Sequence, residues 1–151
     1  MNASITYQIF NDQDIDSLFK LLGKLYKNMV RMELYKLLQR ITKSNKYRTF
    51  LAKDSNENSI AFSTFSIRTD YVEGAGKSPT GYLESIYVEP EYRNLGIAKK
   101  FIELGEEWCK EKGCEQIGSD TWLNDSRAQN FHLRVGFQEE DRLVHFIKKI
   151  E

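Results

Sequence analysis

Apolar residues recur along the chain with two different periods, one typical of strands and the other of helices. Alternating apolar residues predict strands over residues 4–10, 47–54, 59–71, 81–89 and 115–122. Apolar residues three and four positions apart predict helices over residues 15–26, 34–41, 97–109 and 126–135. The last segment, 137–150, is predicted to form one or two closing strands.

The predicted element order is βααβββαβαβ, with one further strand if 137–150 forms two. Strand–helix–strand units dominate the second half of the chain, so we expect an α/β protein whose mixed sheet carries helices on both faces. The length of 151 residues suits a single domain, 1–151, with one core.

Composition and charge narrow the class of protein. Lysine plus arginine and aspartate plus glutamate number 22 each, so the formal net charge is zero. Proteins built around non-specific nucleic-acid binding carry a basic excess, so we expect no nucleic-acid partner. The first residues lack the pattern of a signal peptide, and no apolar run reaches the length of a membrane span. We therefore expect a cytoplasmic protein that does not enter a membrane.

The cysteine and histidine pattern offers no metal site. Cys109 and Cys114 are too few for a disulfide framework, and their spacing from His132 and His145 matches no zinc pattern. Cys109 lies on the apolar stripe of its predicted helix. We expect both cysteines to be structural.

The segment YVEPEYRNLGIAKK, residues 87–100, joins a predicted strand to a predicted helix. A helix N-terminus can hold a phosphate, because its first N–H groups lack partners and carry partial positive charge. Gly96 allows close approach to the backbone, and Arg93 offers a planar donor fork. The spacing alone fits a phosphate site and an ordinary strand-to-helix turn equally well.

Two motifs resemble those of a known family. Arg93-Asn94-Leu95-Gly96-Ile97-Ala98 resembles the acetyl-coenzyme A signature of the GNAT acetyltransferases, Gln/Arg-x-x-Gly-x-Gly/Ala, and NDSRAQNFHLRVGF resembles their second conserved region. The segments DYVEG, SPTGYLESIYV, GSDTWLND and VHFIKK more narrowly resemble the aminoglycoside 6'-N-acetyltransferases. This narrower resemblance covers roughly residues 65–151, and the first 60 residues match only in element order.

The resemblance implies a GNAT fold with acetyl-coenzyme A as its cofactor. It implies that the strand at Ile86, Tyr87 and Val88 offers backbone groups to the pantetheine arm. It also implies that the pyrophosphate is held by the backbone amides of residues 93–98, which are Arg93, Asn94, Leu95, Gly96, Ile97 and Ala98. Lys99 would add positive charge there, and the resemblance further implies that Asn124 touches the cofactor.

Glu84, in the middle of the strand YLES, is the candidate catalytic base. An alkylamine has a pKa of about 10.4, so only a few molecules in ~10,000 are neutral at pH 7 and the proton must be accepted. Simple alternation places Glu84 on one face with Tyr82, Ile86 and Val88, among apolar neighbours. The alternative is an edge-strand glutamate in water. The resemblance places an active-site glutamate here.

Asp120 is the second candidate carboxylate, because it ends a predicted strand. The resemblance implies that it binds the cationic substrate and shares the base role, whereas the alternative is an Asx turn or a cap. Asp125 is the better cap for the helix that begins at Ser126. Glu73, with Tyr71 as a wall for a sugar ring, and Trp122 as a stacking surface are weaker substrate-binding candidates.

His132 occupies the position where many GNAT enzymes carry a tyrosine that protonates the departing thiolate. An imidazole can donate a proton near neutral pH. A structural histidine, or a thiolate that leaves unassisted, fits equally well.

We therefore expect direct acetyl transfer from acetyl-coenzyme A to a small, polyamine-like substrate, preferably the 6'-amine of an aminoglycoside. Two alternatives remain open: an acetyltransferase for a polyamine, peptide N-terminus or lysine, and a non-catalytic acyl-coenzyme A module. Similar enzymes are often dimers, so a homodimer through the segment RLVHFIKK is a further expectation.

Overall fold

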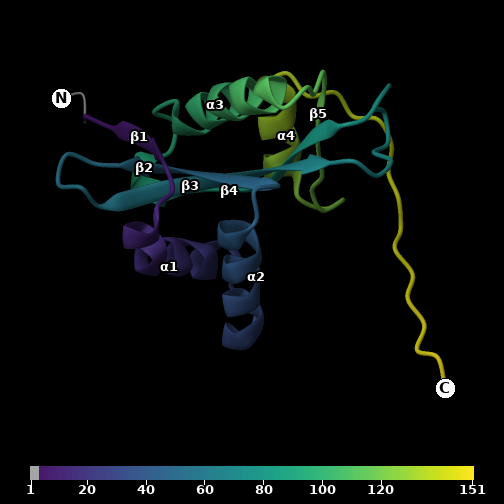
Figure 1. Ribbon diagram of the computed structural model, residues 1–151, viewed down its shortest axis with the longest axis horizontal. Coiled ribbons are helices and arrows are strands. Elements are labelled where there is room, and N and C mark those ends of the chain that lie inside the picture. The colour runs from purple at the N-terminus through teal and green to yellow at the C-terminus, as the bar shows by residue number, and fades with distance from the viewer. Residues whose placement is uncertain (1–3) are drawn as a thin grey trace. The chain divides into compact units, whose positions relative to one another are not determined.

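The computed structural model describes residues 4–151, and a mixed sheet organises the chain up to Ser119. The strands lie in the order β1-β2-β3-β4-β5 (Figure 1). Their bounds are β1 Thr6–Ile9, β2 Tyr47–Lys53, β3 Ser59–Arg68, β4 Thr80–Val88 and β5 Ile117–Ser119. The first four strands pair antiparallel, and β5 pairs parallel with β4. The mixed sheet predicted from the strand–helix–strand units is thereby confirmed.

Helices cover both faces of this sheet. On one face lie α1 (Ile15–Leu25) and α2 (Arg31–Lys43), and on the other lies α3 (Ile97–Glu111) (Figure 1). Short 3-10 turns, η1 (Asp12–Asp14) and η2 (Pro90–Tyr92), precede α1 and α3. The chain divides into two compact units after Ser119, and the second unit contains α4 (Ser126–Arg134).

The helical period places apolar side chains against the sheet on both sides. Leu18, Leu22 and Leu38 of α1 and α2 form a buried cluster with Leu51 and Phe62 of the sheet. On the other face, Phe101 and Trp108 of α3 are buried, as the apolar stripe predicts. Burial of apolar surface of this kind supplies most of the favourable free energy of folding.

A close approach between α3 and β3 requires a glycine. A Cβ atom added to Gly105 would lie 2.1 Å from Cζ of Phe65, well inside van der Waals contact. Phe65 is fully buried, so its ring has no room to retreat. Gly105 therefore sets how closely α3 can pack on the sheet.

A β-bulge interrupts β4 at the position that matters most for function. Thr64 of β3 pairs with Ser85 and Phe65 pairs with Leu83, so Glu84 is left without a partner in the ladder. The extra residue shifts the alternation by one. Ile86 and Val88 consequently point to the α3 side of the sheet, and the expectation that they share a face with Glu84 was wrong.

The parallel pairing of β4 with β5 ends just before the bulge. It covers only Gly81–Leu83 of β4, against Ile117–Ser119 of β5. Beyond Leu83, β4 continues for five residues along β3 without a register partner in β5. The pairing therefore ends where β5 itself ends, at Ser119, one residue before the bulge residue Glu84 in β4.

Residues 137–150 form no strand, which corrects the predicted closing strands. The apolar side chains in this segment are exposed: those of Val144, Phe146 and Ile147 are 72%, 92% and 102% exposed, respectively. Alternating apolar residues form a strand only where another strand completes their hydrogen bonds and covers one face. The sequence pattern cannot say whether such a neighbour exists within the same chain.

Candidate active site

Glu84 lies at the bulge of β4 and is held by two residues of β3. Arg68 Nη2 lies 2.9 Å from Glu84 Oε1 and 3.1 Å from Oε2, and Arg68 Nε lies 3.2 Å from Oε1. Ser66 Oγ donates a further hydrogen bond to Oε1. Both carboxylate oxygens are therefore occupied by donors from one neighbouring strand.

Arg68 also packs on an aromatic ring. Its guanidinium carbon lies 3.4 Å from the ring centroid of Tyr82, a cation–π arrangement. The register explains this grouping, because Ser66 pairs with Tyr82 and paired residues project from the same face. Glu84 thus shares a face with Tyr82, as predicted, but its expected apolar surroundings were wrong because a cation and a hydroxyl hold the carboxylate.

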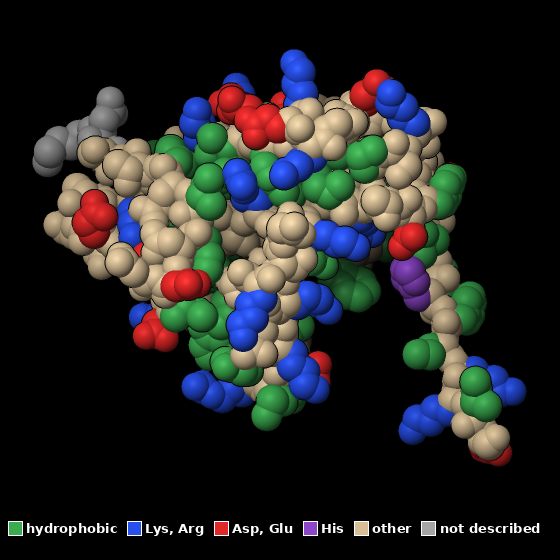
Figure 2. Space-filling view, viewed as in Figure 1, with side chains coloured by type: hydrophobic (Ala, Val, Ile, Leu, Met, Phe, Trp, Pro, Cys, Tyr) green, Lys and Arg blue, Asp and Glu red, His purple; other side chains and the backbone are tan. Residues whose placement is uncertain are grey.

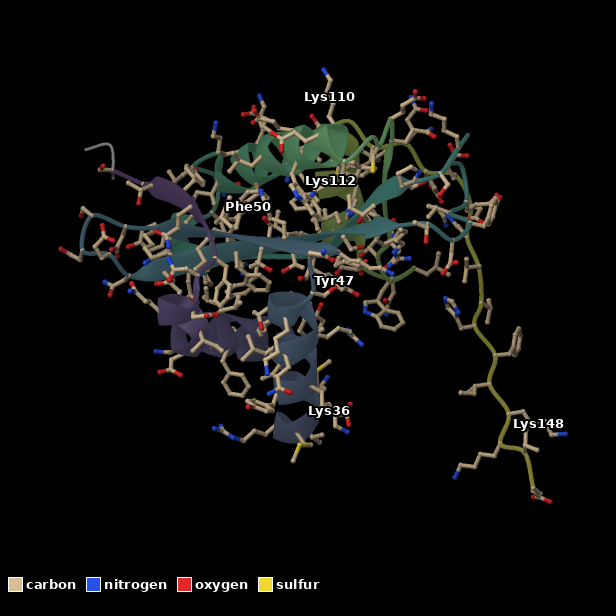
Figure 3. All side chains as sticks on the ribbon, in the orientation of Figure 1. Lys36, Tyr47, Phe50, Lys110, Lys112 and Lys148 are labelled. Carbon is tan, nitrogen blue, oxygen red and sulfur yellow. The ribbon has the colours of Figure 1, made fainter. Side chains whose placement is uncertain are left out.

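A cavity of about 440 Å³ opens beside this group. Glu84, Arg68 and Ser66 line it from the sheet, and Tyr47 lines it where β2 begins. Figure 3 shows Tyr47 on the α2 side of the sheet and Phe50 on the α3 side. The cavity therefore lies on the α1–α2 side of the sheet.

The charged side chains that line the cavity are mostly cationic. Three cationic side chains line it, those of Arg40, Lys46 and Arg68, against two carboxylates, those of Asp70 and Glu84. Lys and Arg side chains also gather over α2 (Figure 2). Glu84 is thus an acid in a cavity whose lining carries more cationic side chains than carboxylates.

The start of α3 has the geometry of an anion site. Gly96 has a φ of 84° and Asn94 a φ of 66°, both in the left-handed region. No side chain caps the first turn of α3. N–H groups at a helix N-terminus, together with left-handed residues before it, form concavities that bind phosphates. The predicted phosphate segment therefore has a suitable backbone.

Arg93 links this loop to the end of β4. Its Nε donates to the carbonyl oxygen of Val88 at 2.8 Å, and its guanidinium carbon lies 5.7 Å from the ring centroid of Tyr87. The two predicted cofactor-binding segments, the end of β4 and the loop of residues 93–96, are thereby tied together. Leu95, in the same loop, is exposed, and Lys99 extends from the first turn of α3.

The loop after β3 carries the weaker substrate-binding candidates. Tyr71 is 80% exposed, and its hydroxyl donates to Glu73 Oε2 at 2.8 Å. Tyr71 lines the same cavity as Glu84. The structure therefore brings Tyr71, and with it Glu73, to the edge of the cavity.

The remaining site candidates belong to the second unit. Asp120 follows β5 directly, Trp122 is 79% exposed, and Asn124 is also exposed. Asp125 caps α4, since its Oδ1 accepts a hydrogen bond from the amide of Ala128 at 3.0 Å. The expectation that Asp125 rather than Asp120 caps this helix is thus confirmed.

His132 makes contacts within the second unit. Its Nδ1 lies 2.7 Å from the carbonyl oxygen of Ala128, one turn earlier in α4. The rings of Phe131 and Phe137 lie edge-on to the imidazole, at centroid distances of 5.6 and 5.2 Å. Nδ1 of His132 is therefore engaged with the backbone of its own helix.

The cysteines have the surroundings of structural residues. Burial raises the pKa of Cys109 to about 12, so its thiolate is scarce at neutral pH. Burial also raises the pKa of Cys114.

Within residues 4–151, no cluster of three or more His, Cys, Asp or Glu side chains is arranged to hold a metal ion. In the same residues, no helix is long and apolar enough to cross a membrane.

Comparison with known proteins assigns the chain to a family. Residues 15–137 match the model of the acetyltransferase (GNAT) family. The chain belongs to the GNAT acetyltransferase family. Its relatives include an aminoglycoside N(6')-acetyltransferase type 1 from Acinetobacter haemolyticus, 36% identical over 87% of this chain and 90% of the relative. Another, from Acinetobacter baumannii, is 36% identical over 79% of this chain and 81% of the relative.

Solved structures in the same family share its fold closely. The aminoglycoside N-acetyltransferase AAC(6')-Iy in complex with CoA superposes with a TM-score of 0.92 at 27% identity, over 99% of this chain and 98% of that protein. AAC(6')-Ih from Acinetobacter baumannii gives a TM-score of 0.90 at 28% identity, over 98% and 100% of the two chains. The predicted GNAT fold is confirmed.

The pattern of the sequence does not single out Arg68 and Ser66 as site residues. They stand two residues apart at the end of β3, so alternation could place them on one face. Only the register of β3 against β4, including the bulge, brings them to Glu84. A one-residue bulge leaves no periodic signal in a sequence.

Proposed function

We propose that this GNAT enzyme transfers the acetyl group of acetyl-coenzyme A to the 6'-amine of an aminoglycoside. The observation that carries the proposal is the 36% identity to an aminoglycoside N(6')-acetyltransferase along 90% of that relative. The structural neighbour AAC(6')-Iy was also solved with a bisubstrate analogue that joins CoA to an acetylated neamine, and that structure is 28% identical to this chain with a TM-score of 0.90.

Acetyl-coenzyme A is the cofactor, and the start of α3 is the proposed seat of its pyrophosphate. The amides of residues 93–98 and the charge of Lys99 would hold this group, and the strand at Ile86, Tyr87 and Val88 would accompany the pantetheine arm. The end of the β4–β5 pairing at Leu83 supports this placement, because residues 84–88 of β4 have no register partner in β5. Asn124 is a proposed additional contact.

In the proposed reaction the amine attacks the thioester directly, and Glu84 accepts its proton directly or through water. Asp120 binds the cationic substrate and shares the base role. Backbone amides near β4 polarise the acetyl carbonyl. The thiolate then leaves with a proton from His132 or unassisted, since a thiol pKa of about 8.5 makes it a tolerable leaving group. The buried, weakly acidic Cys109 supports a route without a covalent acetyl-enzyme.

The proposed substrate contacts are the residues that the family resemblance and the sequence single out, namely Glu84, Tyr71, Glu73, Asp120 and Trp122. The carboxylates would hold ammonium groups, and the aromatic rings would stack on sugars. The surplus of cations lining the cavity favours one competing acceptor class, a peptide amine flanked by carboxylates. Both acceptor classes are therefore included in the test.

The test measures acetyl-coenzyme A consumption with matched aminoglycosides that carry either an amine or a hydroxyl at position 6'. We expect turnover with the amine and none with the hydroxyl compound, because only the amine is an adequate nucleophile. Acidic peptides with free amines form the comparison set. Turnover on the peptides together with none on the 6'-amino compounds would refute the aminoglycoside assignment.

At the level of the whole chain, we propose that residues 1–151 act as one catalytic domain in the cytoplasm. The family match, 15–137, runs across the division after Ser119 and supports this view.

We also propose a homodimer, supported by the exposed apolar side chains of residues 143–150. Sedimentation of the purified chain tests the dimer.

A further inference from the structure

We propose that Arg68 is a displaceable internal cation, which occupies the position at Glu84 that the substrate ammonium must take. The inference rests on the proposed acetylation of a cationic acceptor. It assigns Arg68 as a specificity-determining residue that sets how tightly an acceptor must bind before its amine can reach Glu84.

The contacts of Arg68 are those that a bound ammonium would make. A cation is recognised by a carboxylate and by an aromatic face, and the guanidinium of Arg68 has both, at Glu84 and at Tyr82. Its three hydrogen-bond contacts, at 2.9, 3.1 and 3.2 Å, reach both oxygens of Glu84. A substrate cation therefore cannot pair fully with this carboxylate while Arg68 stays in place.

The ion pair lies where it can open. The side chains of Arg68 and Glu84 are 40% and 25% exposed, so water can replace part of what is lost when they separate. Arg68 is the last residue of β3, next to the loop of residues 69–79. The adjoining cavity of about 440 Å³ has room for the released guanidinium.

A second carboxylate is available to the released side chain. Asp70 stands two residues after Arg68, is exposed, and lines the same cavity. Movement of Arg68 from Glu84 toward Asp70 would keep the guanidinium paired while it frees Glu84 and the ring of Tyr82.

Displacement costs free energy, and the acceptor must supply it through its other contacts. Removing the guanidinium should therefore strengthen binding of the acceptor and leave binding of acetyl-coenzyme A unchanged. If Arg68 instead serves only to orient Glu84, its removal should lower kcat without strengthening acceptor binding. The two roles predict opposite signs for the change in acceptor affinity.

The experiment compares Arg68→Gln with the matched control Arg48→Gln. Arg48 is also a strand arginine stacked over an aromatic ring, with its guanidinium carbon 5.5 Å from the ring centroid of Trp108, but it lines a different cavity. We expect the KM for a 6'-amino aminoglycoside to fall up to about fivefold in Arg68→Gln, the upper range for a partly exposed ion pair. The KM for acetyl-coenzyme A should stay unchanged in Arg68→Gln. In Arg48→Gln, neither the KM for the aminoglycoside nor the KM for acetyl-coenzyme A should change. An acceptor KM that stays equal or rises would overturn the proposal.

A second measurement needs no turnover and so separates this inference from the proposed function. Calorimetry should detect methylguanidinium binding to Arg68→Ala, but not to the wild type or to Arg68→Ala/Glu84→Gln. Binding only to Arg68→Ala supports a cation subsite even if no aminoglycoside is acetylated. Equal binding to all three proteins, or binding to none, would contradict the subsite while leaving the proposed acetylation intact.

Discussion

At the scale of single residues, the surroundings of Glu84 decide its chemistry. The sequence predicted a strand glutamate on the same face as Tyr82, and that much is confirmed by the register. Its ion pair with Arg68 could not be predicted, because it depends on a bulge that brings residues of β3 and β4 into contact. The proposed roles of Glu84 as a base and as a cation site both depend on its charged form.

Replacing Glu84 with glutamine should remove the proton acceptor while preserving the size of the side chain. We expect kcat/KM to fall by about 10²- to 10⁴-fold, the usual contribution of a positioned base. Asp14→Asn is a matched control, because Asp14 also accepts hydrogen bonds from a cation, Lys53, and from a neutral side chain, Gln8. Steady-state kinetics would measure kcat/KM, and thermal melts would compare the stability of the variants. Wild-type activity in Glu84→Gln would rule out Glu84 as the base.

At the scale of secondary-structure elements, periodicity predicted most strands and helices, and α1, α2 and α3 each bury the apolar face from which they were predicted. It failed for residues 137–150, whose apolar side chains are exposed. It also could not predict the bulge or the short pairing of β4 with β5, which follow from backbone registers rather than from composition. The predicted phosphate loop agrees with the backbone found before α3, because its glycine and asparagine adopt left-handed conformations.

The packing of α3 on β3 gives a stability prediction. Gly105→Ala places a methyl group against the buried ring of Phe65, and we expect it to lower the free energy of unfolding by about 1–3 kcal/mol. Gly23→Ala in α1 is the control, because its Cβ would lie 3.5 Å from Leu34, an ordinary contact. This control should be neutral or raise stability by up to about 1 kcal/mol through helix propensity. Urea unfolding measures both, and equal stabilities of the two variants would contradict the packing argument.

At the scale of the whole molecule, a formal net charge of zero conceals a local surplus of cations at the proposed acceptor cavity. Sequence composition cannot reveal this arrangement, because Arg40, Lys46 and Arg68 come from separate parts of the chain. Family membership, in contrast, rests on motifs that the sequence displays directly and on a match across residues 15–137. Family membership thus assigns acetyl transfer. The identity of the acceptor is what a biochemical assay must test.

The most direct test of the central claim is the position of the acetyl group on the product. The wild-type chain is incubated with acetyl-coenzyme A and an aminoglycoside that carries amines at position 6' and elsewhere, and the product is examined by two-dimensional NMR. The proposed function predicts one acetyl group, on the 6'-nitrogen. An acetyl group on another nitrogen, or unmodified aminoglycoside under conditions in which the chain binds acetyl-coenzyme A, would contradict it.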